Sequence, residues 1–123
     1  GDANVDDHSQ ITALAEEFRS VQKVLIALGD ENRQHLILEM MQIGNCSVVR
    51  VGEITARTHL SRPAVSHHLQ ILKDAGIVKM RREGTRNYYY FDTKPESLNR
   101  LTAMLEHVKQ IMAQLPDRNE AEW

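Results

Sequence analysis

The chain has 123 residues, 41% of them hydrophobic and 26% charged, which suits one globular domain with a core of its own. It has no apolar run long enough to cross a membrane, no visible signal peptide, and a single cysteine, Cys46, which excludes a disulfide framework; we expect a soluble cytoplasmic protein. The formal net charge is −2, but residues 50–91 hold eight basic and three acidic residues, a local charge of +5 that favours a phosphate-rich partner.

Two helices are predicted before the basic segment. Residues 1–10 are polar and are expected to form a disordered tail. From residue 11 to residue 28, apolar side chains alternate at spacings of three and four, which is typical of a helix with one apolar seam. Gly29 ends this helix, and Asp30 is a good N-cap for the next, which Gly44 ends. The seam of the first helix consists of Ile11, Leu14, Phe18, Val21, Leu25 and Leu28.

The basic segment predicts a helix-turn-helix. A short helix from Val51 to Thr58 is followed, after a brief turn, by a helix over residues 62–75 with Ser61 as its N-cap and Gly76 just after its end. The inner face of this second helix is apolar, and His68 lies on it, where we expect a packed structural histidine. The outer face is either the solvated side of an ordinary amphipathic helix or a surface for the major groove of DNA. It carries donors and acceptors and no carboxylate: Arg62, Ser66, His67, Gln70 and Lys73.

A β-hairpin follows this helix-turn-helix. Residues 77–91 consist of two β-rich runs around a loop that contains Gly84, which predicts the wing of a winged helix-turn-helix. Its arginines, Arg81, Arg82 and Arg86, are expected to reach the flanking minor groove or its phosphates. The alternative for each of them is a solvated charge on the hairpin.

A long helix closes the chain. Thr93 and Glu96 match a capping box at the start of a helix over residues 94–115, and residues 116–123 are expected to be a flexible tail. The predicted fold is therefore mainly α with a small β-hairpin wing, a single winged helix-turn-helix domain over residues 11–115. The seam of the last helix consists of Leu98, Leu101, Leu105, Val108, Met112 and Leu115.

Four segments together resemble the ArsR/SmtB family of bacterial winged-helix repressors. They are ALGDENRQHLILEMM at 27–41, VGEI at 51–54, LSRPAVSHHLQILKDAGIV at 60–78 and RREGTRNYYYF at 81–91. The resemblance implies a homodimer that binds a short palindromic operator in double-stranded DNA and represses transcription, in many members until a metal ion or another inducer releases it. An enzyme is not expected, because the chain has no nucleophile, paired-carboxylate or phosphate-loop motif.

The resemblance places DNA contacts at the start of the helix over residues 62–75. Arg62 can bind guanine O6 and N7 or a phosphate, and Ser61 and Ser66 suit phosphate oxygens or base edges. His67 can donate to a phosphate or to a guanine N7. The family's contacts fall on Ser61, Arg62, Ala64, Ser66 and His67, with Val51 near the DNA backbone, and Gln70 shares their face of the helix.

The two seam helices predict a dimer. Each could pack within one chain, but two such helices on either side of a small DNA-binding unit favour pairing with a partner subunit. A two-fold dimer would place its recognition helices about 34 Å apart, one turn of DNA. The predicted interface consists of Leu14, Phe18, Val21, Leu25, Leu101, Leu105, Val108 and Met112.

No sensory site is evident. Metal-sensing relatives use a Cys-x-Cys pair before the recognition helix, or Asp-x-His and His-x-x-Glu on the last helix; here the first site has no cysteine and the second keeps only His107. Cys46 lies where some relatives carry sensory thiols, but a dithiol switch needs two cysteines. We expect no metal and no cofactor. An unknown inducer, or a metal or thiol response through an unrecognised site, stays open.

A second interpretation also stays open. A winged helix can serve protein or RNA contact, with the tyrosines at 88–90 as a stacking platform. One observation opposes this interpretation. Successive side chains of a strand point to opposite faces, so alternate tyrosines are needed to pack on the helices and are not available for stacking on bases.

Overall fold

The computed structural model describes residues 2–43 and 48–118. Gly44 and Cys46 lie outside the described residues, together with the expectations attached to them, and so do residues 119–123 of the predicted tail. The elements are α1 (Asp2–Ser20), α2 (Gln22–Leu28), α3 (Glu31–Ile43), β1 (Val49–Arg50), α4 (Val51–Ala56), α5 (Arg62–Asp74), β2 (Val78–Glu83), β3 (Arg86–Phe91) and α6 (Glu96–Ala113).

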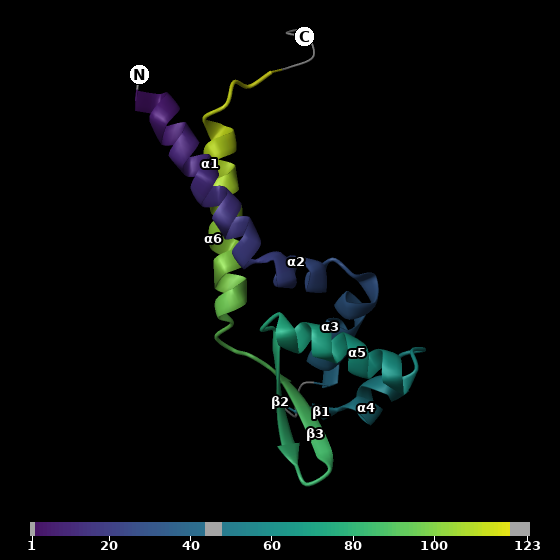
Figure 1. The fold of residues 1–123 in the computed structure, drawn as a ribbon. Helices are drawn as coiled ribbons and strands as arrows, with labels where there is room; N and C mark the ends of the chain where they lie inside the picture. The colour runs from purple at the N-terminus through teal and green to yellow at the C-terminus, as the bar shows by residue number, and fades with distance from the viewer. Residues whose placement is uncertain (1, 44–47, 119–123) are drawn as a thin grey trace.

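The chain folds into an arm and a head (Figure 1). The arm consists of α1 and α6, which run antiparallel side by side, and the head consists of α2 to α5 with the β-sheet at the lower end of the arm. This confirms the predicted fold, mainly helical with a β-hairpin wing. In the described part of the chain, no helix is both long and apolar enough to span a membrane.

The N-terminal helix differs from the prediction at both ends. It begins at Asp2, so the predicted disordered tail is wrong for residues 2–10. It also ends at Ser20, and Val21, with φ −110° and ψ 9°, separates it from α2. Val21 is 1% exposed and belongs to the core of the head, so the break turns α2 toward α3 and α5 while α1 stays beside α6. The spacing of apolar residues continues through Val21 without interruption. The sequence pattern therefore predicts one straight helix and does not indicate the bend.

The sheet has one strand more than the predicted hairpin. It is antiparallel with the order β1–β3–β2, and Gly84, at φ +63°, makes the turn between β2 and β3. All six residues of β2 pair with the six of β3. The added strand β1 has two residues and places Arg50 opposite Tyr88. Two residues are too few for a strand pattern to show in a sequence.

The start of α6 also corrects the prediction. Pro95 is the N-cap and makes no side-chain capping hydrogen bond, so the predicted capping box of Thr93 and Glu96 is wrong. The helix starts two residues later than a threonine cap requires, because a turn intervenes: Asp92 Oδ1 accepts a hydrogen bond from Lys94 N at 2.9 Å.

A buried arginine joins the helices of the head. Arg33 on α3 is 7% exposed, and its guanidinium donates from Nε to Ala27 O at 2.8 Å and from Nη2 to Ile26 O at 3.0 Å. Both carbonyls lie in the last turn of α2, where few backbone donors remain; Ile26 O also accepts from Gly29 N at 3.3 Å. Arg33 Nη1 lies 3.2 Å from Nδ1 of His68 on α5. Arg33 therefore links α3 to α2 and α5 by polar contacts, in addition to the hydrophobic core that these helices share.

Replacing Arg33 with methionine should lower the free energy of unfolding by about 2–4 kcal/mol, because the buried carbonyl of Ala27 and the partly buried carbonyl of Ile26 lose a charged donor. Urea denaturation followed by circular dichroism measures this loss. Arg100, exposed on α6, offers a matched control, and Arg100→Met should change stability by less than about 0.5 kcal/mol. Equally small losses in both variants would show that the buried arginine does not hold the helices.

Candidate nucleic-acid interface

The helix α5 has the apolar and polar faces that the sequence predicts, but the polar face is not free of carboxylates: Gln70 Nε2 donates to Asp74 Oδ1 at 2.8 Å, and Lys73 is half-buried. Ser61 is its N-cap, with Oγ accepting a hydrogen bond from Ala64 N at 3.2 Å, and Gly76 follows its end at φ +77°. On the inner side Val65, Leu69 and Leu72 are fully buried. On the outer side the exposed residues are Arg62, His67 and Gln70, with Ser66 half-buried among them.

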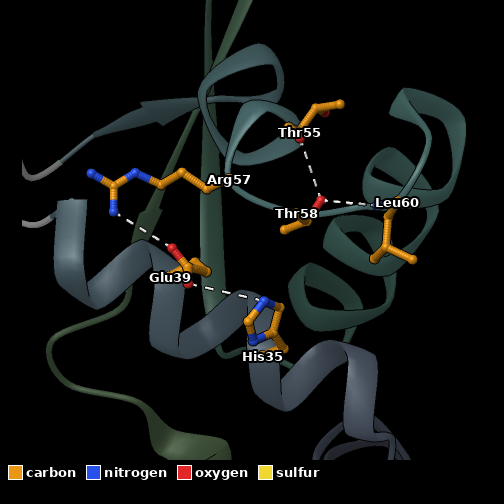
Figure 2. A network of polar contacts seen from close by, with 6 residues as sticks. All are labelled: His35, Glu39, Thr55, Arg57, Thr58 and Leu60. Carbon is orange, nitrogen blue, oxygen red and sulfur yellow. Dashed lines mark hydrogen bonds and ion pairs between the residues drawn. The ribbon is translucent and has the colours of Figure 1, made fainter.

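Polar contacts hold the turn between α4 and α5 (Figure 2). Thr58 Oγ1 donates to Thr55 O at 3.5 Å and accepts from Leu60 N at 3.3 Å. Glu39, on α3, reaches across to Arg57 at the end of α4, with 3.5 Å between Oε2 and Nη1. Most of the Glu39 side chain is buried, so this contact between α3 and α4 is better shielded from solvent than an ordinary surface pair.

A cleft of about 780 Å³ opens where α4, α5 and the hairpin meet. Three arginines from three different elements line it, Arg50 from β1, Arg62 from α5 and Arg86 from β3, against one acid, Glu53. The chain as a whole is acidic, yet this concave surface is basic. The other lining residues are Val51, Gly52, Ala56, Ser66, Gln70, Thr85, Asn87 and Tyr89.

Half of the predicted contact residues line this cleft and half lie outside it. Val51 lines the cleft but is only 9% exposed and belongs to the core, so its side chain has little surface to offer a ligand. The cleft gathers Val51, Arg62, Ser66, Gln70 and Arg86; Ser61, Ala64, His67, Arg81 and Arg82 lie beyond it.

The wing arginines differ in what they already bind. Arg82 Nε donates to Gly84 O at 3.1 Å, and Arg81 Nε lies 3.2 Å from Glu83 Oε1, so both are engaged within the hairpin. The guanidiniums of Arg62 and Arg86 make no hydrogen bond or ion pair with the part of the chain that the structure describes. These two guanidiniums are therefore the ones that can accept an external anion without first losing an internal contact.

The sequence alone did not assign four polar residues to the cleft: Arg50, Glu53, Thr85 and Asn87. Arg50 counts toward the basic segment, but only the pairing of β1 with β3 shows that it lies beside the wing. Thr85 and Asn87 flank Arg86 at the tip of the hairpin, and a hairpin pattern does not say which side chains turn toward α5.

His68 packs inward, as predicted. Burial lowers the pKa of His68; the Arg33 guanidinium lowers it further, and the Asp30 carboxylate acts in the opposite direction. A neutral ring whose Nδ1 accepts from Arg33 Nη1 fits this environment. The neighbouring His67 stays exposed, with its ring centroid 5.9 Å from that of His68.

The predicted dimer residues fall into three groups. Val21 is in the core of its own chain, so its assignment to a partner-facing surface is wrong. Leu14, Leu101 and Val108 are half-buried against the core. Those that remain exposed in the single chain are Phe18, Leu25, Leu105 and Met112.

His107, the one histidine shared with the metal-sensing pattern, joins the two helices of the arm. Its Nδ1 lies 2.9 Å from Glu17 Oε1 on α1. Residues 2–43 and 48–118 contain no group of three or more His, Cys, Asp or Glu side chains that could hold a metal ion.

Known proteins share this architecture and sequence. The family model described as "Bacterial regulatory protein, arsR family" matches residues 32–80, from α3 into β2. An uncharacterized HTH-type transcriptional regulator of Methanocaldococcus jannaschii is 36% identical over 75 residues, which are 61% of this chain and 81% of that protein. The arsenical resistance operon repressor of Bacillus subtilis is 31% identical over 87 residues, 71% of this chain and 78% of that protein. The chain belongs to the ArsR family.

A solved structure agrees with this membership. It is the homodimeric winged helix-turn-helix DNA-binding domain of a possible ArsR-family transcriptional regulator from Mycobacterium bovis, with 28% identity and a TM-score of 0.52. The match covers 89% of this chain and 93% of that one. The chain is thus an ArsR-family DNA-binding transcriptional regulator, and the packing of α1 on α6 is consistent with the ArsR dimer arrangement.

The lowered pKa of His68 makes stability depend on pH. Because the folded state binds this proton less readily than the unfolded chain, whose histidine pKa is 6.5, the contribution of His68 is complete above that pH and is lost as the pH falls through the folded pKa. An NMR titration of the His68 ring should give a pKa below 6.5. In urea denaturation, His68→Gln should flatten the loss of stability that accompanies a fall in pH below 6.5. A ring that titrates above 6.5 would contradict this account.

Proposed function

We propose that this ArsR-family regulator is a repressor that binds a palindromic operator as a homodimer. One observation carries the proposal: the unpaired guanidiniums of Arg62 and Arg86 converge on one cleft from α5 and from the wing. Unpaired cations on a concave surface suit the phosphates of a duplex that enters between helix and hairpin. The Bacillus subtilis relative is itself named a repressor, which supports repression here.

The exposed apolar residues of the arm support the homodimer. A monomer rarely leaves so many large apolar side chains in water, and the same surface of a second copy would cover them. The Mycobacterium bovis neighbour is homodimeric. The exposed apolar residues on α1 and on and just after α6 are Ile11, Phe18, Leu105, Met112 and Leu115.

The residues of the two DNA-facing elements take different roles in this proposal. Arg62, at the start of α5, reads guanine in the major groove, and Gln70 and Ser66 lie on the same face. Ser61 and His67 hold phosphates at the rim of the cleft. Arg86 enters the minor groove or binds its phosphates, with Arg81 and Arg82 as further charges on the wing.

The rival interpretation has less support. Of the three tyrosines at 88–90, Tyr89 is part of the core and Tyr88 and Tyr90 are half-buried, so none of them offers a fully exposed ring to the bases of a single strand. We assign the regulator no cofactor, and we place it in the cytoplasm, where a protein that acts on chromosomal DNA works.

Selection of bound duplexes from a random pool tests the proposal. We expect a palindromic motif whose half-sites lie about one turn of DNA apart, bound with an affinity that falls steeply as salt rises. No enrichment, or preference for single strands, would overturn it.

Arg62→Ala and Arg86→Ala should weaken binding in different ways. Loss of the Arg62 contact should cost about 1–3 kcal/mol and relax the preference at particular base pairs. Loss of Arg86 should weaken all duplexes more evenly. Binding to the selected motif and to single-base variants measures both effects, and equal losses across every sequence would show that the two residues do not differ in role.

An aspartate at Leu105 should separate the dimer. Leu105 is 50% exposed in the single chain, so Leu105→Asp leaves the fold intact, yet in a dimer the same charge would be buried without a partner. Light scattering after size exclusion measures the mass. Leu38 on α3 is 58% exposed and lies off the arm, so Leu38→Asp is the matched control and should stay dimeric. A dimeric Leu105→Asp protein would place the interface elsewhere.

A further inference from the structure

Two opposite charges stand side by side at the edge of the cleft. Arg50 ends β1 and Glu53 lies in the first turn of α4, and both line the cleft with Arg62 and Arg86. Glu53 Oε1 accepts a hydrogen bond from Arg50 N at 3.1 Å and lies 3.8 Å from Arg50 Nε. Both side chains are about half exposed, so the pair is open to an approaching ligand.

The backbone around Arg50 is fixed from two sides. On one side it pairs with Tyr88 of the wing, and on the other it is the N-cap of α4. Its guanidinium therefore starts from the junction between the hairpin and the helix-turn-helix, within the cleft that Arg62 and Arg86 also line. A phosphate that enters this cleft can therefore come near all three arginines.

The ion pair of Arg50 with Glu53 is easily exchanged. Exposed pairs of this length contribute little stability, so a phosphate can replace the carboxylate as the partner of the guanidinium at small cost. The carboxylate cannot leave as easily, because the N–H of Arg50 holds one of its oxygens. Glu53 is the one acid among the residues that line the cleft, and it stays close to where phosphates would lie.

We propose that Arg50 is a further contact to the DNA backbone, and that Glu53 positions Arg50 while its negative charge limits how tightly the regulator holds a duplex. This inference rests on the proposed function, since it assigns further residues to the same cleft. It predicts that substitutions of Arg50 and Glu53, which contact each other, change the affinity for DNA in opposite directions.

The test uses the full chain and a labelled mixed-sequence duplex of about 30 base pairs, with binding followed by fluorescence anisotropy over a range of salt. Arg50→Gln should weaken binding about 3–10-fold at low salt and make the dependence of log affinity on log salt shallower by about 1 per subunit. Arg50→Lys keeps the charge and should keep the slope.

Glu53→Gln should tighten binding about 2–5-fold at low salt, with the gain shrinking as salt rises. The amide oxygen of glutamine can still accept from Arg50 N, so the local structure is preserved. The exposed pair of Arg100 and Glu96 on α6, 3.5 Å apart and outside the cleft, supplies matched controls. Arg100→Gln and Glu96→Gln make the same charge changes and should leave affinity within about 2-fold.

The outcomes separate this inference from the function on which it rests. If the folded wild-type protein does not bind duplex, the proposed function fails. If wild type binds and Arg62→Ala does not, but Arg50→Gln behaves like Arg100→Gln, only the inference fails. If Glu53→Gln weakens binding or changes the preference for one base pair, the carboxylate reads a base, such as the amino group of cytosine, and does not limit affinity.

Discussion

The structure depends on the buried guanidinium of Arg33. A cation in a protein interior is costly unless its donors are satisfied, and here Ile26 and Ala27 supply carbonyl oxygens at the end of α2 while His68 supplies a ring nitrogen on α5. The same contact that completes α2 therefore sets the distance between α2, α3 and the DNA-facing helix. Because His68 serves the core, its neighbour His67 and the rest of the outer face stay available for DNA.

An acidic protein can bind DNA when its charge is distributed unevenly. Opposite charges several Debye lengths away are screened, so the local potential of the cleft matters more than the net charge of −2. The cleft is basic because it collects arginines from β1, α5 and β3 and a single carboxylate. Whether an arginine is free matters as much as its position. Arg81 and Arg82 make exposed contacts within the hairpin that a phosphate would first have to replace, whereas the guanidiniums of Arg62 and Arg86 have no such partner in the part of the chain that the structure describes.

The break at Val21 separates two tasks within a single run of apolar residues. Before it, α1 lies along α6 and leaves Phe18 exposed; after it, α2 turns into the head and contributes Val24 and Ala27 to the core. In a continuous helix, the apolar residues before and after Val21 would lie on one face and pack against the same neighbouring element. The bend joins the arm directly to the helices that Arg33 links.

The sequence by itself determined the elements that have strong local signals. The N-caps Ser61 and Asp30, the glycine after α5, the apolar face of α5 and the hairpin around Gly84 were all predicted, because caps, glycine conformations and periodicity act within a few residues. Tertiary structure alone decided the bend at Val21, the strand β1, the capping of α6 and the role of Arg33. It also decided which polar residues share the cleft, bringing in Arg50 and Asn87 and excluding Arg82. These features arise from pairing and packing between segments that are distant in the chain. A local sequence pattern does not contain information about such contacts.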